Sequence, residues 1–549
     1  MPRRLTLIGL GVLVVALLIW ILPRPLKTKA VAPAVVVAPP SVPLPARPEI
    51  FPELPGAELA ADLVRRATIA ELQRALQRPN ARANEAVLTF ATDAAYRAFL
   101  NRAESAGLTI IGRLDALRTV RLRTDSLSPL ADDLTAHPGD YANIGANYLL
   151  YPPETQTPPK EDRAAIREIP LGNNSLAFLG VTGDHSQWGL GTTIAVLDSG
   201  ISGDATFGTG RLRALDVGLG LAPGNGAEDG HGTAVAGLAA GLSPDAPGVS
   251  PSANLLSLRV TDATGTSDLF TVAQAIVAAV DAGAKILNLS LGGYGTGPAL
   301  TAAIDYATAR GAVLVAAAGN NQAAQLTWPA ADPRVISVGA VDALGQQVTF
   351  SNSGEQLQVS APGYGVQTAW LDGRRVTVDG TSASAPFVAG AIAAVMSQNP
   401  SLTAAQAWQV LAETVSEAGA PGPDPDYGRG ILNIGWAMNR NNPTYADPAV
   451  ASHYYDAANR QVQFIVQNRG NLPVSGLSLA ITTDSSSSTT SVPYLLSGAT
   501  FVVNVPLNFA ALPPSTSLTF SSQLTLPSGQ ADQVPSNNRK SSRFTSPAK

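Results

Sequence analysis

The central half of the chain, from Leu171 to Met438, alternates between short apolar segments and longer segments rich in Ala and Gly. Strands that are apolar on both faces and are separated by helices form a parallel sheet with helices on each side. Sheets of this kind carry their functional residues at the carboxyl ends of the strands. The clearest predicted strands are residues 193–197, 255–260, 285–289, 313–317 and 335–340, and the clearest predicted helices are residues 267–282 and 297–310.

Length and composition limit what else the chain contains. Its 549 residues are too many for one core, and ordinary domain sizes predict about three folded units. Hydrophobic residues make up 45% and charged residues 14%, which favours a globular protein over a disordered one. The formal net charge of -5 offers no basic surface to a phosphate backbone, so we expect no nucleic-acid partner. The absence of Cys excludes disulfides and thiolate zinc sites.

The N-terminus predicts export. Arg3 and Arg4 precede residues 5–22, an uncharged run that is long enough to enter or cross a membrane. The run is either a signal peptide or a retained signal anchor, because basic residues in front of it do not suit a buried core helix. Residues 30–32 (Ala-Val-Ala) form a candidate cleavage site, but Pro33 directly after them favours the anchor. We therefore expect a protein that is secreted, or anchored on the extracytoplasmic side of a membrane.

Changes of composition along the chain predict its organisation. The recurrent prolines of residues 23–56 are typical of an extended spacer. Residues 57–152 predict a helix and then the order β-α-β-β-α-β, which is ferredoxin-like. Beyond residue 440 Thr, Ser and Val alternate as in an Ig-like β-sandwich. The predicted parts are a membrane-directed segment (1–22), a Pro-rich linker (23–56), an α+β unit (57–152), a second linker (153–170), the α/β domain (171–440) and the sandwich (446–549).

Asp198 is the first candidate catalytic residue, because it directly follows the predicted strand of residues 193–197. A carboxylate at the carboxyl edge of a parallel sheet can orient a histidine. Strands also end in Asp simply to begin a turn, so Asp198 alone does not establish a function.

His231 is the second candidate, and it lies between Gly230 and Gly232 at the start of an Ala-rich predicted helix. The glycines leave the imidazole open to a substrate and to a second side chain, unlike a histidine packed in a core. Metal ligation is the alternative interpretation. No H-E-x-x-H pattern, second paired His or Cys accompanies His231, which argues against a metal site.

Ser382 is the third candidate, within the sequence Gly380-Thr381-Ser382 that leads into a predicted helix. A helix N-terminus supplies free backbone N–H groups and the positive end of the helix dipole, and both stabilise a developing oxyanion. The alternative interpretation is that the serine only caps the helix.

Taken together, the sequences around Asp198, His231 and Ser382 resemble the subtilisin-like (subtilase) family of serine peptidases, and their order in the chain agrees. The segment Ala316-Ala317-Ala318-Gly319-Asn320 is similar to the one in which the family places its oxyanion-hole Asn, which implies that role for Asn320. The resemblance extends from about Leu171 to Met438. The chain departs from the family at Ala383, where Met is common, and at Phe387, where His is common.

The resemblance implies a subtilisin-like three-layer fold with a parallel sheet, and an exported serine endopeptidase that works through an acyl-enzyme. Ser382 would be the nucleophile, His231 the base and Asp198 the residue that orients the base. The family likeness further implies that Ser290, Leu291 and Gly292 form the edge that pairs with an extended substrate. Small uncharged residues near this edge favour an apolar or broad preference: Gly293, Ala317, Gly319 and Thr327.

The flanking regions resemble known companions of such enzymes. Residues 57–152 are similar to an inhibitor-type propeptide, which implies a self-processing precursor cut between Tyr151 and about His185. The alternative is a permanent ferredoxin-like domain. The C-terminal hundred residues resemble a CARDB-like domain, which implies contact with a cell surface or polysaccharide, or else only a stabilising module.

Two other functions are compatible with parts of the pattern. A catalytically inactive subtilase-fold scaffold is one, but the candidate triad and Asn320 are all chemically competent residues. An esterase with the same triad is the other, but its nucleophile would stand in G-x-S-x-G, unlike Gly380-Thr381-Ser382. We expect no required cofactor. The family resemblance allows structural calcium, but the sequence does not identify its ligands.

Overall fold

The computed structural model describes residues 56–153, 168–203, 205–216, 229–484 and 486–546. The predicted membrane-directed segment (5–22) and nearly all of the Pro-rich linker lie outside these ranges. Within the ranges, no helix combines the length and the hydropathy that a membrane crossing needs.

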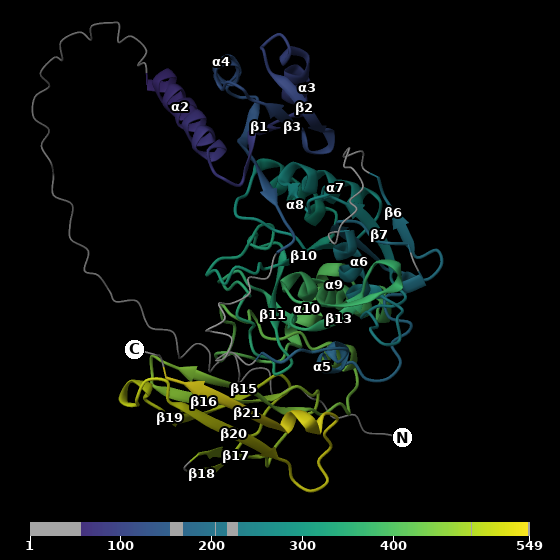
Figure 1. Ribbon diagram of the computed structural model, residues 1–549, viewed down its shortest axis with the longest axis vertical. Helices are drawn as coiled ribbons and strands as arrows, with labels where there is room; N and C mark the ends of the chain where they lie inside the picture. Colours follow the sequence, from purple (N-terminus) through teal and green to yellow (C-terminus); the bar gives the residue numbers. More distant parts are fainter. Residues whose placement is uncertain (1–55, 154–167, 204, 217–228, 485, 547–549) are drawn as a thin grey trace, which may run out of the picture. The chain divides into compact units, whose positions relative to one another are not determined.

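A seven-stranded sheet forms the centre of the α/β region, and every pair of neighbouring strands is parallel. This confirms the sheet predicted from the apolar segments (Figure 1). The strands in spatial order are β12 (Val359–Pro362), β11 (Ile336–Val341), β10 (Val313–Ala317), β9 (Ile286–Leu289), β5 (Thr193–Asp198), β7 (Asn254–Arg259) and β6 (Leu212–Ala214).

Helices cover both faces of this sheet, which gives the predicted three layers. In β5, Ile194 and Val196 pack against α6 (Asp229–Ala240), α9 (Thr381–Gln398) and α10 (Ala404–Glu413). Ala195 and Leu197, which alternate with them, pack against α7 (Leu269–Asp281) and α8 (Pro298–Ala309). All four side chains are fully buried, and burying one Val, Ile or Leu contributes about 1.5–3 kcal/mol. Strand β5 is therefore held from both sides.

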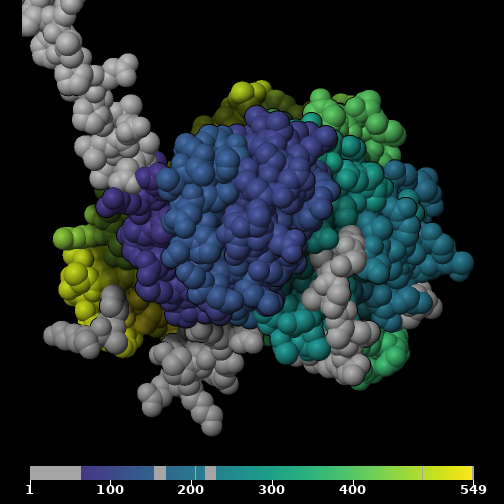
Figure 2. Space-filling view, turned by 90° about the horizontal axis from the view of Figure 1, so that it is seen from above, coloured from purple at the N-terminus to yellow at the C-terminus, as the bar shows by residue number. Residues whose placement is uncertain are grey.

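The N-terminal α+β unit builds an antiparallel sheet in the order β2-β3-β1-β4, and its core includes Phe90 and Phe99. Figure 2 shows the outer surface of this unit, in blue, as a continuous packed patch. Its elements are α2 (Gly56–Leu76), β1 (Ala81–Phe90), α3 (Asp93–Arg102), β2 (Thr109–Leu114), β3 (Thr119–Arg123), α4 (Ser128–Ala136) and β4 (Tyr141–Leu150).

A short strand of the α/β region, β8 (Ser267–Asp268), extends this sheet by pairing antiparallel with the end of β4. The sequence predicted helix from residue 267, and that start is wrong by two residues. The side chain of Asp268 accepts a hydrogen bond from the backbone N–H of Thr271 and caps α7. The helix therefore begins at Leu269 and leaves Ser267 and Asp268 extended.

The C-terminal region forms two antiparallel sheets that enclose a core with Phe464 and Phe520, as the alternating pattern predicts (Figure 1). One sheet contains β15 (Pro448–Asp456), β16 (Gln461–Asn468) and β19 (Thr500–Pro506). The other contains β18 (Ser487–Ser491), β17 (Ser478–Thr483), β20 (Ser517–Thr525) and β21 (Arg539–Thr545). The other α-helices and strands among the described residues are α5 (Ser175–Phe178), the hairpin of β13 (Val366–Ala369) and β14 (Arg375–Val378), and α11 (Ile434–Asn439).

Candidate active site

Asp198 is the last residue of β5 and lies at the carboxyl edge of the parallel sheet. Its side chain is almost completely buried. The Oδ1 atom accepts a 2.7 Å hydrogen bond from the backbone N–H of Ser199 and lies 2.7 Å from Nδ1 of His231. A carboxylate held in this way keeps the proton of a neutral imidazole on Nδ1, which leaves Nε2 free to accept one.

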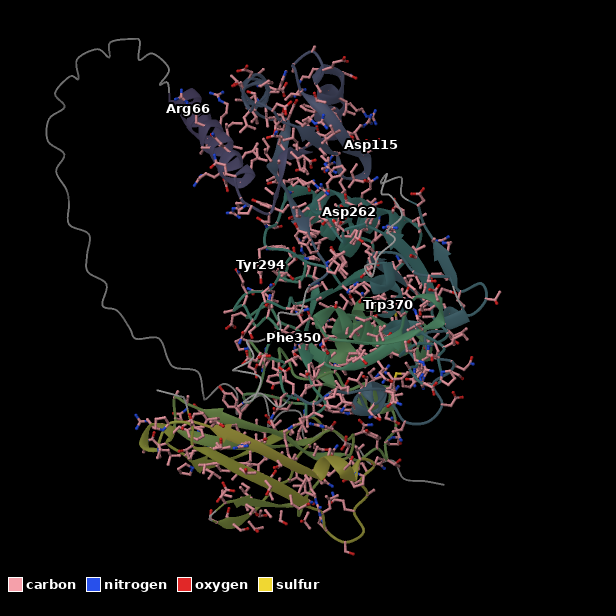
Figure 3. All side chains as sticks on the ribbon, viewed as in Figure 1. Arg66, Asp115, Asp262, Tyr294, Phe350 and Trp370 are labelled. Atoms are coloured by element: carbon pink, nitrogen blue, oxygen red, sulfur yellow. The ribbon has the colours of Figure 1, made fainter. Side chains whose placement is uncertain are left out.

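His231 lies in the first turn of α6, and both of its neighbours are glycines for a packing reason. A Cβ atom at Gly230 would overlap the ring of Trp370, and one at Gly232 would overlap the carbonyl oxygen of Gly200. Figure 3 labels Trp370, which covers this turn from the end of the β13–β14 hairpin. The imidazole keeps 23% of its surface exposed, while Asp198 beside it is buried.

Two opposing effects set the pKa of His231. Burial, the largest effect, lowers the pKa because it disfavours the charged imidazolium. The negative charge of Asp198 and its hydrogen bond favour the imidazolium and outweigh burial, so the pKa is raised above its ordinary value. The site therefore stabilises the protonated histidine that forms when it accepts a proton.

Ser382 is the second residue of α9. Gly380 occupies the N-cap position, at φ +134°, and no side chain caps the helix. The hydroxyl of Ser382 is therefore not a helix cap, which removes the structural alternative. In the first turn the backbone N–H groups of Thr381 and Ala383 donate to Asn320 and to the carbonyl oxygen of Gly380. The N–H of Ser382 lies between them at the helix N-terminus, where backbone donors are suited to an anion.

His231 and Ser382 line the same cavity, which has a volume of about 460 Å³. No hydrogen bond joins the two side chains among the contacts of the described residues. Catalytic hydrogen bonds are often long outside the reacting complex, so this separation is compatible with proton transfer. The cavity is bordered by Pro152, Pro153, His231, Trp370, Ser382 and Ala383, among others.

Asn320 follows β10 and is fully buried. Its Oδ1 accepts hydrogen bonds from the backbone N–H and the hydroxyl of Thr381, at 2.9 and 2.8 Å. Its Nδ2 must then face away from Thr381, and it donates a 2.8 Å hydrogen bond to the carbonyl oxygen of Pro153. A Cβ atom at Gly380 would lie 2.8 Å from this Nδ2 and 3.1 Å from Oγ of Ser382, so both polar atoms border the same point.

The three residues of the predicted substrate edge make different contacts. Gly292 exchanges two backbone hydrogen bonds with Tyr151, at 2.8 and 3.0 Å, in an antiparallel bridge. Ser290 instead donates from its hydroxyl to the carbonyl oxygen of Ser382, at 2.8 Å. Leu291 is fully buried in the core between the sheet, α7 and α8. Among these three, only Gly292 pairs with the chain that passes through the site.

Comparisons with known proteins agree with this geometry. The sequence pattern described as "Subtilase family" matches residues 189–430. Subtilisin Savinase of Lederbergia lenta is 36% identical over 255 residues, which cover 45% of this chain and 90% of that protein. The thermostable alkaline protease of Halalkalibacterium halodurans is 35% identical over 273 residues, 49% of this chain and 73% of that protein. The chain belongs to the subtilase family.

As a subtilase, the protein is a serine endopeptidase, a hydrolase of peptide bonds. Among solved structures it is similar to a cold adapted subtilisin-like serine proteinase, with 30% sequence identity and a TM-score of 0.39. That likeness covers 46% of this chain and 90% of the other. The family assignment rests on the relatives named above.

Two residues of this subtilase site were given no role from the sequence. Thr381 fixes the direction of the Asn320 amide, and the signal for it was its place in the Gly380-Thr381-Ser382 sequence. Trp370 packs over the turn that carries His231, and it approaches from a hairpin more than 130 residues later in the chain. Nothing in the local sequence of this subtilase indicates that contact.

Structural calcium, which the subtilase family allows, stays a prediction without assigned ligands. Among the described residues, no three His, Asp or Glu side chains gather into a group that would hold a metal ion. Asp262, for example, accepts hydrogen bonds from Thr264 and Thr266 in its own loop. We therefore assign no metal site in these parts of the chain.

Proposed function

We propose that this endopeptidase cuts polypeptides with Ser382 as nucleophile, His231 as general base and acid, and Asp198 as the residue that orients His231. Asn320 supports the oxyanion together with the backbone N–H of Ser382. In the first step Oγ of Ser382 attacks the substrate carbonyl while Nε2 of His231 takes its proton. The same proton then passes to the leaving amine, and water hydrolyses the acyl-enzyme.

One observation carries this assignment. A peptide carbonyl oxygen, that of Pro153, accepts a hydrogen bond from Asn320, while Pro153 borders the cavity shared by His231 and Ser382. Donors aimed at a carbonyl beside a serine and a histidine stabilise the charge that develops when the carbonyl is attacked. The Thr381 contacts fix these donors before the substrate arrives.

We infer further that the enzyme is made as a self-processing precursor, with the unit of residues 57–152 as its intramolecular inhibitor. The support is its packing against α7. Asn147 accepts a hydrogen bond from the backbone N–H of Phe270, at 3.1 Å, and Arg82 pairs with Asp268 at 2.6 Å. Residues of this unit also share a core with α7 and α8. These contacts hold the end of β4 at the cleft.

Export to the extracytoplasmic side is part of the same proposal, and the uncharged run of residues 5–22 supports it. N-terminal sequencing of the isolated precursor shows whether that run is kept as an anchor or removed as a signal peptide. For the C-terminal sandwich we propose contact with a surface or a polysaccharide. The alternative is that the sandwich only stabilises the protein. Binding of the isolated enzyme to cell-wall material would support surface contact, and no binding would support the stabilising module.

A fluorophosphonate probe tests the assignment of the nucleophile. Wild type should be labelled and should degrade an unfolded protein, while Ser382→Ala should do neither. Ser384→Ala is the matched control, since Ser384 is a buried serine of the same helix whose hydroxyl contacts only the carbonyls of Ala361 and Pro362. It should keep both activities. Absence of labelling in folded wild type would favour an inactive scaffold.

A further inference from the structure

A second cavity, of about 400 Å³, is lined by residues of both the α/β domain and the C-terminal sandwich, and it shares no lining residue with the candidate active site. Hydrogen bonds join the two regions. The side chain of Gln467 accepts from the backbone N–H of Glu417, at 2.9 Å, and donates to the carbonyl oxygen of Val415, at 3.1 Å. The side chain of Asn471 donates to the carbonyl oxygen of Asn439, at 2.7 Å. Proteins bind small molecules in cavities of about 300–1,000 Å³, so this one is large enough for a ligand.

Two buried oxygen atoms in the lining of this cavity have no hydrogen-bond partner among the described residues. They are Oε1 of Glu417 and Oδ1 of Asn537. Only 9% of the surface of Glu417 is exposed. The amide nitrogen of Asn537 already has a partner, because it donates to Oδ1 of Asp447 at 2.7 Å. A buried acceptor without a donor is destabilising, so both oxygens favour a ligand that donates hydrogen bonds.

Two cationic side chains of the sandwich line the same cavity. Nε of Arg469 donates to the side chain of Gln467 at 3.1 Å, and its terminal nitrogens have no hydrogen-bond partner within the described ranges. Nζ of Lys540 lies 3.4 Å from the carbonyl oxygen of Leu344. Neither cation forms an ion pair with a described side chain. A guanidinium and an ammonium group that are free to donate together suit a carboxylate.

The pKa values of these groups show that their charges lack partners. Burial raises the pKa of Glu417 to about 7 and lowers the pKa of Lys540 to about 8. Burial also raises the pKa of Asp447 and lowers that of Arg469. In each case burial is the largest effect, and it outweighs the attraction between opposite charges. A ligand that carries one positive and one negative group would stabilise the charged forms, and clusters of such shifted groups are typical of binding sites.

The position of the charges gives the cavity a direction. Glu417 belongs to the α/β domain, whereas Arg469 and Lys540 belong to the sandwich. Apolar side chains complete the wall, among them Phe178 and Ile431. The cavity therefore fits a molecule with an ammonium group, a carboxylate group and an apolar body.

We propose that this cavity binds a small zwitterion, namely a free amino acid or a short peptide with an apolar side chain. The ammonium group of the ligand donates to Oε1 of Glu417, its carboxylate accepts from Arg469 and Lys540, and Asn537 accepts from a further N–H group. The site uses none of the candidate catalytic residues, so it is independent of the proposed function. Amino acids and short peptides are released where proteins are degraded, so a peptidase meets such ligands as products.

Binding is measured on full-length Ser382→Ala, which prevents digestion of the protein, by calorimetry and thermal unfolding. The pH is 7.5, between the pKa values of Glu417 and Lys540, where most of each group is charged. The probes are leucine and the dipeptide Ala-Leu, with N-acetyl-leucine, which lacks the ammonium group, and leucine amide, which lacks the carboxylate. Leucine, Ala-Leu or both should bind saturably and raise the unfolding temperature, and which of them binds identifies the source of the ligand.

The two blocked compounds should bind at least about tenfold more weakly, the loss expected for one hydrogen bond to a charged group. If neither leucine nor Ala-Leu binds at about 10 mM, a concentration above the range of weak binding, the cavity holds only water and the proposal is wrong. Equal affinity for blocked and unblocked compounds would also overturn it. This comparison needs no substitution in the cavity.

Glu417→Gln, added to Ser382→Ala, tests the contact to the ammonium group. It should weaken the zwitterion that binds at least about tenfold and leave N-acetyl-leucine unchanged. Glu413→Gln, at an exposed position of α10, is the matched control and should bind like the parent. An unchanged affinity in folded Glu417→Gln would contradict the proposed orientation of the ligand.

Lys540→Gln tests the opposite end of the ligand in the same way. It should weaken the zwitterion but not leucine amide, which has no carboxylate to lose a partner. Arg543→Gln removes an exposed cation from the same strand, β21, and should have no effect. Equal affinities of Lys540→Gln and Arg543→Gln for the zwitterion would overturn the role of Lys540 in the site.

Discussion

The side-chain amide of Asn320 donates a 2.8 Å hydrogen bond to the main-chain carbonyl oxygen of Pro153, which lies 167 residues earlier in the chain. The contact joins the end of the N-terminal unit to the loop after β10. It places a peptide carbonyl beside the cavity that His231 and Ser382 line.

Thr381 should act as a positioning residue for the Asn320 amide. Thr381→Val keeps the shape of the side chain but removes the hydroxyl that bonds to Oδ1 of Asn320. We expect kcat to fall about tenfold with little change in KM, because only the transition-state contact is loosened. Thr381→Ser should recover most of the loss. Asn320→Leu gives the upper limit, about 10²–10³ in kcat, a size measured in subtilisin, a relative of this chain.

The acid limit of activity should follow the environment of His231. The histidine must be neutral to accept the proton, so kcat/KM falls as the pH drops through its pKa. Asp198 raises that pKa, and burial lowers it. In Asp198→Asn only burial remains, so the acid limb of kcat/KM should move to lower pH, while kcat falls about 10⁴-fold. The pH profile of kcat/KM is measured for Asp198→Asn, and the residual activity of the double variant Asp198→Asn/Ser382→Ala is subtracted as background. An acid limb that stays in place would show that Asp198 does not set this pKa.

Glu417 should destabilise the fold at alkaline pH. Burial raises the pKa of this carboxyl from 4.5 to about 7. Its contribution to stability is therefore complete below pH 4.5 and is lost as the pH rises through 7. Discounted for partial contact with solvent, the loss is about 2 kcal/mol.

The test is thermal unfolding in a Ser382→Ala background, which prevents self-digestion. Glu417→Gln should unfold at a higher temperature than its parent at pH 9 and at a similar temperature at pH 4. Glu413→Gln, an exposed position of α10, is the matched control and should show no such pH dependence. Equal shifts for the two variants would contradict the prediction.

His453 should make the C-terminal sandwich sensitive to acid. Burial, followed by the charge of Lys540, lowers the pKa of His453 from 6.5 to about 3. The neutral ring contacts Phe464 and lies 2.7 Å from the hydroxyl of Ser522. The stability that it contributes is present above pH 6.5 and is lost as the pH falls toward 3.

Hydrogen exchange of residues 448–546 reports on this region alone. Between pH 7 and pH 4 the protection of wild type should fall, after correction for intrinsic exchange rates, and His453→Gln should lose less protection. His137→Gln, at an exposed position of the N-terminal unit, serves as control. A parallel loss of protection in the His453→Gln and wild-type proteins would rule out this histidine as the cause.

Much of the fold follows from local patterns in the sequence. The apolar run before Asp198 predicted a buried parallel strand, because a strand covered on both faces has no polar positions. The alternating Thr, Ser and Val beyond residue 440 predicted the sandwich, because strands with one buried face and one exposed face alternate between apolar and polar residues. The start of α7 was misplaced because Asp268 contacts both its own helix and Arg82, a partner that the sequence does not place nearby.

The candidate site was less accessible to such reasoning. The triad and Asn320 were predicted from their flanking motifs, and their roles stay predictions until the variants are measured. The place of Ser290 on the substrate edge also stays a prediction, and its hydroxyl has a contact that the sequence did not indicate, with the carbonyl of Ser382. Trp370 and Pro153 carry no local signal, since each reaches the site from a distant segment. Such contacts depend on packing across the fold, which no short pattern encodes.

The strand pairing at β8 and Gly292 has a consequence in time. A cut anywhere beyond Tyr151 would remove none of the hydrogen bonds that hold Leu149, Leu150 and Tyr151. A newly processed molecule would therefore still hold the end of its N-terminal unit in the cleft. Its turnover of other proteins would start only after a lag set by how fast a folded unit departs, and dilution would shorten that lag only where the unit can rebind.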